Sequence, residues 1–287
     1  MTRWEHDGAS LAVIGGRFRV LRSALGWAYT ERLLDVEPLR RMRGPGRCAL
    51  RRSLSENDVR VLLATAELRL LETVAHDTGA PVNRLGRHRA EQDLLLVRLA
   101  ADTGARRGEL AALRLTSLRG TTLHIDRAIS GRQLTPPKSG RGRMLTVGTT
   151  TATLWHQLVS EWTPQPVTDT EADDPHATLG PWLFSADLDH RHRLGAETLG
   201  HRFARLRDEA GVPGATLHRL RHSVATFLVA RGQVLQAQAR LGHADAATTL
   251  REYAYALPLT DQAVAEQIDR RLAQPPDGRA QQARRTT

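Results

Sequence analysis

The sequence LHRLRHSVATFLVARG at residues 217–232 has the apolar spacing of an amphipathic helix. Its apolar residues recur at helical intervals and therefore predict one buried face. They are Leu217, Leu220, Val224, Phe227 and Leu228. His218 and Arg221 fall together on the opposite side, which we expect to be polar. That side is either a solvated basic face or part of a binding site.

His218 and His222 also have the spacing of two zinc ligands on one helix turn. A zinc site needs further ligands, but no glutamate follows His218 and no third ligand is evident from the sequence. Arg221, which lies between the two histidines, would repel a cation. We therefore expect neither a metal ion nor any other cofactor.

A second motif, LGHADAATTLREYAY, occupies residues 241–255. Gly242 is expected to end one helix, because glycine readily adopts the left-handed conformation found after a helix C-terminus. Asp245 is expected to cap the N-terminus of the next helix. Tyr253 and Tyr255, two of the three tyrosines of the chain, fall at the end of that helix. Packing in the core is the alternative to a chemical role for them.

A third motif, TGARRGEL, occupies residues 103–110. Arg106 and Glu109 share a helix face, where an ordinary ion pair is the alternative to a catalytic role. Gly104 permits a close approach of the backbone, and a phosphate near the helix N-terminus is one candidate for the approaching group. Further upstream, Ser55 and Asp58 predict a capping box at the start of another helix.

The sequence between residues 121 and 147 predicts a small antiparallel sheet. Residues 121–129 and 143–147 alternate between apolar and polar side chains, as half-buried strands do. The intervening residues 136–142, PPKSGRG, are turn formers, so we expect a hairpin tip there. Lys138, the only lysine among 41 lysines and arginines, would then lie at the end of the sheet.

Composition separates a short N-terminal region from a larger C-terminal one. Residues 18–39 have helical spacing, and Pro38 with the linker RGPGR at residues 43–47 ends that helix. We therefore expect a partial helical domain at residues 1–46 and a catalytic domain at residues 53–273, which includes a polar surface loop at residues 163–181. Residues 274–287 are polar and are expected to be a disordered tail.

The net charge of +10 favours a polyanionic partner, and nucleic acid is the foremost candidate. Cys48 is the only cysteine, which excludes a disulfide framework and fits a reducing compartment. The N-terminal residues carry charges within each apolar run, and no run is long enough to span a membrane. We therefore expect a soluble, cytoplasmic bacterial protein that associates with the nucleoid when it is bound to DNA.

Taken in this order, the motifs resemble those of the tyrosine recombinases, the phage integrase family, over residues 53–272. That family carries an arginine in a TG-x-R-x-x-E-L helix, a lysine on a β-hairpin, an H-x-x-R helix and an LGH motif followed by a tyrosine. The matching residues are Arg106, Lys138, His218, Arg221, His243 and Tyr253, with Glu109 as the supporting carboxylate. The resemblance implies a mainly α fold with a small antiparallel sheet.

The resemblance also implies a mechanism. Tyr253 would attack a DNA phosphate, and Arg106 and Arg221 would stabilise the negative charge of the transition state. His218 and His243 would add hydrogen bonds, and either of them could also accept the tyrosine proton. The departing 5′-oxygen needs a proton, which arginine cannot supply and lysine can, so Lys138 is predicted to be the general acid. The expected partner is double-stranded DNA, bound by a tetramer that is monomeric in free solution; an accessory DNA-bending or directionality factor is left open.

Two departures from the family leave alternatives open. Tyr255 stands where many members have a histidine, so it competes with Tyr253 for the role of nucleophile. The N-terminal region resembles only the second half of the family's core-binding domain, which puts tight DNA binding in doubt. A catalytically impaired DNA-binding relic and a type IB topoisomerase are therefore alternatives to an active site-specific recombinase.

Overall fold

The computed structural model describes residues 8–44, 53–76, 81–162 and 181–253, together with residues 256, 266, 269, 270 and 273. The chain divides into two compact units, Met1–Arg52 and Ser53–Thr287. The predictions for the loop after residue 162, for Tyr255 and for the tail at 274–287 lie outside the described residues, as do the apolar residues Val264, Ile268 and Leu272. No described helix is long and apolar enough to cross a membrane.

The first unit contains one long helix, α2 (Leu11–Thr30). It starts earlier than the sequence predicts because Ser10 caps it, accepting a hydrogen bond from the Val13 amide at 3.4 Å. It also ends well before Pro38, at Thr30, with Glu31 as the C-cap and Arg32 in a left-handed conformation. Val20, near the middle of this helix, is 71% exposed.

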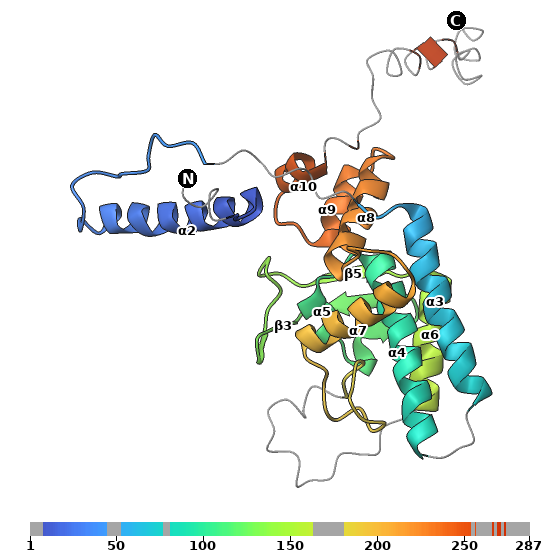
Figure 1. Cartoon of the computed structure of the whole chain (residues 1–287). Coiled ribbons are helices and arrows are strands. Elements are labelled where there is room, and N and C mark those ends of the chain that lie inside the picture. The colour runs from blue at the N-terminus through green and yellow to red at the C-terminus, as the bar shows by residue number, and fades with distance from the viewer. Residues whose placement is uncertain are drawn as a thin grey trace, which may run out of the picture. The chain divides into compact units, whose positions relative to one another are not determined.

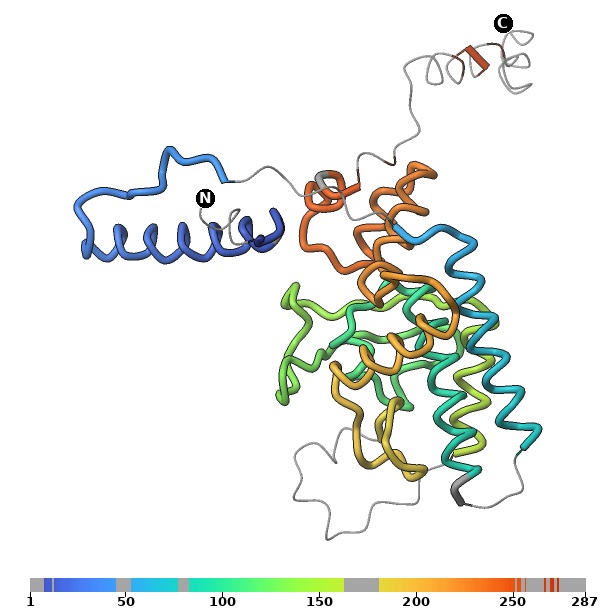
Figure 2. Tube along the Cα trace, viewed as in Figure 1, coloured from blue at the N-terminus to red at the C-terminus, as the bar shows by residue number. Residues whose placement is uncertain are grey.

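The helices of the second unit form two groups. α4 packs against both α3 and α6, which run beside it (Figure 1). α8 also packs against α4, and α8, α9 and α10 contact one another to form the second group (Figure 2). The bounds are α3 (Glu56–Ala75), α4 (Pro81–Thr103), α5 (Arg107–Ala111), η1 (Leu115–Ser117), α6 (Thr149–Glu161), α7 (Ala196–Glu209), α8 (Leu217–Val229), α9 (Val234–Leu241) and α10 (Ala246–Tyr253).

Several helix termini confirm the local predictions. The hydroxyl of Ser55 accepts from the Asp58 amide and the Asp58 carboxylate accepts from the Ser55 amide, both at 3.0 Å, which completes the capping box of α3. Gly242 ends α9 with φ of 64°. Asp245 caps α10 through a 2.9 Å hydrogen bond from the Ala247 amide. These contacts are local, and they follow from residues a few positions apart.

The strands form two small antiparallel sheets rather than the one hairpin predicted. β2 pairs with β1 and with β5, so that Leu123 lies opposite Leu145 and both side chains are buried. β3 and β4 form a separate hairpin between β2 and β5. The expectation that Lys138 lies at a hairpin tip is therefore wrong, because this residue lies in the loop that leads from β4 to β5. The bounds are β1 (Leu118–Arg119), β2 (Thr122–Ile125), β3 (Ala128–Ser130), β4 (Gln133–Thr135) and β5 (Arg143–Thr146).

The core of the second unit has a large and a small part. The large part surrounds the buried side of α4 and includes Trp155 and Phe203. The small part lies among α8, α9 and α10 and is made of Ala225, Val229, Ala237, Leu241 and Tyr253. Tyr253 is thus packed into the helices that carry the two C-terminal motifs.

Candidate active site

Most of the predicted site residues lie where the α4–α5 turn meets α8 and the α9–α10 turn. Arg106 precedes α5, while His218 and Arg221 lie on α8. His243 lies between α9 and α10, and Tyr253 is the last residue of α10. The topology therefore brings together motifs that are more than 100 residues apart, as the contact between Arg221 and Gly104 across 117 positions illustrates.

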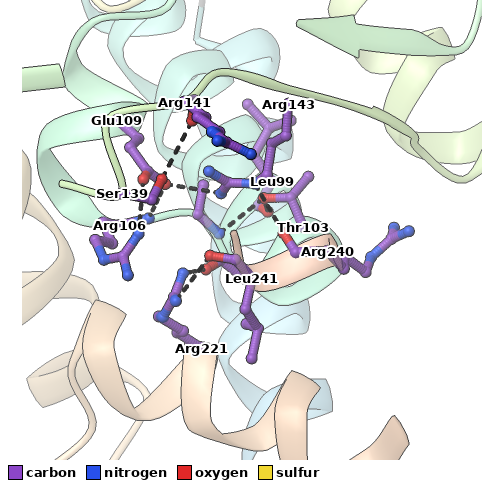
Figure 3. Close-up of polar contacts among 12 residues, drawn as sticks. Leu99, Thr103, Arg106, Glu109, Ser139, Arg141, Arg143, Arg221, Arg240 and Leu241 are labelled. Carbon is purple, nitrogen blue, oxygen red and sulfur yellow. Dashed lines mark hydrogen bonds and ion pairs between the residues drawn. The ribbon is translucent and has the colours of Figure 1, made fainter. Parts of the chain in front are cut away.

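Glu109 lies at the centre of a network of arginines (Figure 3). Its carboxylate accepts hydrogen bonds from Nη1 of Arg106 at 3.0 Å and from the Arg106 amide at 2.8 Å. It also accepts from Nη2 of Arg143 at 2.8 Å. Only 1% of the Glu109 side chain is exposed. Glu109 therefore orients Arg106 while it is shielded from water.

Burial by itself raises the pKa of Glu109. The hydrogen bond and the charge of Arg143, together with those of Arg106, outweigh burial and hold the pKa below its ordinary value. Glu109 is consequently ionised at neutral pH and compensates one of the two positive charges beside it. The network retains a net positive charge, which suits an anionic ligand.

Arg143 was not predicted as a site residue. Besides Glu109, its guanidinium donates through Nε to the carbonyl oxygen of Arg240 at 2.9 Å (Figure 3). A Cβ atom at Gly242 would lie 2.9 Å from Nη1 of Arg143, so the guanidinium fills the space that glycine leaves. Arg143 thus ties β5 to the LGH turn. Nothing in the sequence distinguishes it from the other arginines, because its partners are distant along the chain.

Arg221 is buried, so the side of α8 that carries it is not a solvated basic face at this residue. It donates to the carbonyl oxygens of Gly104 at 2.7 Å and Leu241 at 2.8 Å. The α4–α5 and α9–α10 turns cover that side of the helix, which the periodicity of α8 alone cannot reveal. Burial, followed by the charge of Arg106, lowers the pKa of Arg221 to about 10, so the guanidinium remains charged at neutral pH.

Gly104 has φ of +62°, and a Cβ atom there would lie 2.7 Å from Cδ2 of Leu241. The close approach predicted at this glycine is therefore made by Leu241. The same turn presents the Gly104 carbonyl to Arg221, so the glycine serves the packing of the site.

His243 is half-buried, and its Nδ1 atom is hydrogen-bonded to the Thr249 hydroxyl at 2.8 Å. Burial, followed by the charges of Arg221, Arg106 and Arg143, lowers the pKa of His243 to about 4. The imidazole is therefore neutral at pH 7. If the fully buried Thr249 donates to Nδ1, the proton of the ring lies on Nε2, from which it can be donated to a ligand.

The hydroxyl of Tyr253 lies 2.8 Å from Nδ1 of His222, and only 1% of Tyr253 is exposed. Nε2 of His222 is in turn 3.0 Å from Nε2 of His218, which is exposed. This hydrogen bond to the tyrosine oxygen thus comes from a histidine other than the predicted His218 and His243. His222 is therefore a site residue that the sequence interpretation missed, although its spacing from His218 was noted as a metal-binding pattern.

Lys138 is exposed in the β4–β5 loop. No hydrogen bond or ion pair joins its side chain to any other residue that the structure describes. Ser139, which follows it, donates to the carbonyl oxygen of Arg141 at 3.2 Å (Figure 3). Lys138 therefore has not been brought into the network that Arg106, Glu109 and Arg143 form.

The site combines several guanidinium groups, one buried carboxylate and a tyrosine hydroxyl. Such a set can bind a phosphodiester through charge-assisted hydrogen bonds and can present an oxygen nucleophile to it. Within the described ranges, no group of three or more histidine, cysteine, aspartate or glutamate side chains is placed to hold a metal ion.

Comparison with known structures shows the same fold in several proteins. One of them is the Tn1549 transposon integrase in complex with transposon right end DNA, at 17% identity and with a TM-score of 0.66. The matched region covers 95% of the present chain and 83% of the integrase chain. The chain also matches a lambda integrase dimer bound to a COC′ core site at 16% identity, with a TM-score of 0.57, covering 88% and 76%. XerH site-specific recombinase bound to a palindromic difH substrate matches at 20% identity, with a TM-score of 0.57, covering 91% and 68%.

A search of curated protein sequences finds no match. The model of the phage integrase family, in contrast, matches residues 56–258, which span α3 to α10 and every motif described above. This chain belongs to the phage integrase family, the tyrosine-type site-specific recombinases.

Proposed function

We propose that the protein cleaves and rejoins double-stranded DNA at specific sites through a 3′-phosphotyrosyl intermediate, with Tyr253 as the nucleophile. The tyrosine oxygen bonds to phosphorus while the bond to the 5′-oxygen breaks. Because the phosphotyrosine bond retains the energy of the broken bond, rejoining needs no ATP. The observation that carries the proposal is the Tyr253 hydroxyl, which lies 2.8 Å from Nδ1 of His222 on α8, the helix that also carries His218 and Arg221.

Arg106 and Arg221 are proposed to bind the non-bridging oxygens of the phosphate, where negative charge accumulates in the transition state. The role of Glu109 is to hold Arg106 by its side chain and its amide. His243 contributes a neutral hydrogen-bond donor, since its low pKa prevents it from carrying a charge. These assignments are supported by the hydrogen bonds and the burial of the residues concerned.

Lys138 is proposed to donate a proton to the departing 5′-oxygen. This assignment rests on chemistry, because an ammonium group can lose a proton near neutral pH when cations surround it and a guanidinium cannot. The exposed position of Lys138 implies that the β4–β5 loop must approach the phosphate when DNA binds.

The nucleophile can be tested with a nicked duplex that traps the covalent intermediate. The recombination site is first selected from random-sequence duplexes by binding to the full-length chain. Tyr253→Phe is expected to abolish covalent adducts, whereas Tyr255→Phe is expected to retain them. Adducts that persist in Tyr253→Phe would refute the assignment.

The relic and topoisomerase alternatives differ from a recombinase in measurable ways. A relic would bind the selected duplex without forming an adduct. A type IB topoisomerase would relax supercoiled DNA but would not exchange strands between two sites. The match to the phage integrase family supports the recombinase.

The first unit is proposed to be part of a helical core-binding domain. Its helix α2 carries exposed apolar side chains, among them Val20 at 71% and Trp27 at 61%. Such residues suit a packing partner, whereas an isolated helix would keep polar groups on its surface.

Assembly into a tetramer on paired DNA sites is proposed to use a groove of about 1090 Å³ on the second unit. The groove lies among α3, α8, α9 and β5, and apolar side chains such as Val59, Met144 and Phe227 line it. We assign it to residues 257–274 of a neighbouring protomer, whose apolar residues Val264, Ile268 and Leu272 are spaced along one helix face. Exchange in one direction around the ring then closes the assembly.

Deletion of residues 259–287 tests this proposal. The shortened protein is expected to fold and to bind a single site, but to form fewer complexes that contain two paired sites. If it unfolds instead, the segment belongs to the core of its own protomer and the exchange is excluded.

A further inference from the structure

The hydrogen-bonded series Tyr253–His222–His218 leads from a buried oxygen to the surface. The tyrosine hydroxyl lies 2.8 Å from Nδ1 of His222, and Nε2 of His222 lies 3.0 Å from Nε2 of His218. The two imidazole rings are nearly perpendicular, at 85°, with their centroids 4.5 Å apart. The Nδ1 atom of His243 is hydrogen-bonded to the Thr249 hydroxyl.

We propose that His222 is a catalytic residue that accepts the proton of Tyr253 and relays a proton to His218. This inference deepens the proposed function and rests on it. In the resting state, the Tyr253 hydroxyl donates a hydrogen bond to Nδ1 of His222. The ring proton of His222 lies on Nε2, which donates a hydrogen bond to Nε2 of His218.

The transfer balances at each atom. As the tyrosine oxygen attacks phosphorus, its O–H bond breaks and an N–H bond forms at Nδ1 of His222. The Nε2–H bond of His222 then breaks, and an N–H bond forms at Nε2 of His218. His222 ends neutral in its other tautomer, and His218 ends as an imidazolium. In the reverse reaction, the same steps return the proton to Tyr253 as the DNA strand rejoins.

Electrostatics explains why the proton would not remain on His222. Tyr253 faces it from α10, His243 faces it from the α9–α10 turn, and Arg221 and His218 flank it on α8. His222 is partly buried, and burial disfavours a positive charge on its ring. His218 is exposed, so water stabilises the imidazolium there. The relayed charge also reaches the outer side of the site, where it can bond to a non-bridging phosphate oxygen.

The experiment measures the rate of adduct formation by the full-length chain on the nicked duplex described above. His222→Ala and His222→Gln are both expected to bind DNA normally and to form adducts roughly 100- to 1,000-fold more slowly, the range for loss of a general base. Added imidazole should restore a substantial part of the rate in His222→Ala, because it can occupy the space left by the ring. It should not help His222→Gln, whose side chain fills that space. His124→Ala, which removes an exposed histidine of β2, serves as the matched control and should behave as wild type.

Three outcomes would overturn the relay. An unchanged rate in His222→Gln would show that a hydrogen bond without proton transfer is sufficient. A faster rate in His222→Ala would show that the contact restrains Tyr253. A slow rate in His222→Ala that imidazole cannot raise would indicate a structural role. If wild type itself forms no adduct, the proposed function fails instead, so the two failures can be told apart.

Discussion

Replacing Glu109 with glutamine tests whether its carboxylate holds the arginine network together. The glutamine side chain has nearly the same volume as glutamate, so the packing of α5 is preserved. Its amide, however, has only one acceptor oxygen, and its NH2 group must face the N–H groups of Arg106 or Arg143. The change therefore removes the negative charge and leaves a buried guanidinium without its partner.

The expected loss of stability follows from the geometry. Glu109 accepts three hydrogen bonds at 2.8–3.0 Å, and removal of one partner from a buried pair costs about 3–5 kcal/mol. Arg106 is 29% exposed and can recover bonds to water, whereas Arg143 is 8% exposed and cannot. We therefore expect a loss of about 3 kcal/mol, near the lower end of that range.

Equilibrium unfolding in urea measures this loss. With a slope of about 3 kcal/mol per molar urea, the unfolding midpoint of Glu109→Gln should fall by about 1 M. Glu56→Gln is the matched control, because Glu56 pairs with Arg60 on an exposed face of α3. The Glu56 side chain is 66% exposed and the Arg60 side chain 73% exposed. This control should lose less than about 0.5 kcal/mol.

The pH dependence provides a second check. Since the pKa of Glu109 is held below its ordinary value of 4.5 in the folded state, its ionised form stabilises the protein above that pH. The contribution is lost as the pH falls through the lower, folded-state pKa. The difference in unfolding free energy between wild type and Glu109→Gln should therefore be constant near neutral pH and shrink below about pH 4.5. Equal midpoints for Glu109→Gln and Glu56→Gln at pH 7 would refute the reasoning.

Three further outcomes are expected. Lys138→Arg should bind DNA but cleave it very slowly. A substrate with a 5′-bridging sulfur, whose leaving group needs no proton, should restore cleavage by this variant. If wild type cleaves that substrate and the variant does not, Lys138 is excluded as the acid. Gly104→Ala should lose about 1–3 kcal/mol more unfolding free energy than Gly120→Ala, and should therefore unfold at a lower urea concentration. Both glycines have positive φ, but only a Cβ atom at residue 104 would meet another side chain. Thr249→Val should slow adduct formation about tenfold by freeing the tautomer of His243, and Thr249→Ser should not; equal rates for the two variants would exclude this role.

Local signals in the sequence were sufficient for several elements of the second unit. The capping box of Ser55 and Asp58, the helix end at Gly242 and the cap at Asp245 are each made by residues close together along the chain. Their interactions form whenever the helix forms, so the residue types predict them directly. The order of the motifs, likewise, indicated the family that the match over residues 56–258 shows.

The environment of Arg221, the position of Lys138 and the partner of Tyr253 depended instead on the tertiary structure. The turns at Gly104 and Leu241 bury Arg221, although the periodicity of α8 places it on a polar side. The inserted β3–β4 hairpin moves Lys138 out of the expected hairpin tip. His222 meets the hydroxyl of Tyr253 across 31 positions. Contacts of this kind arise only when separate helices pack, and the spacing of residues within one helix contains no information about what covers it.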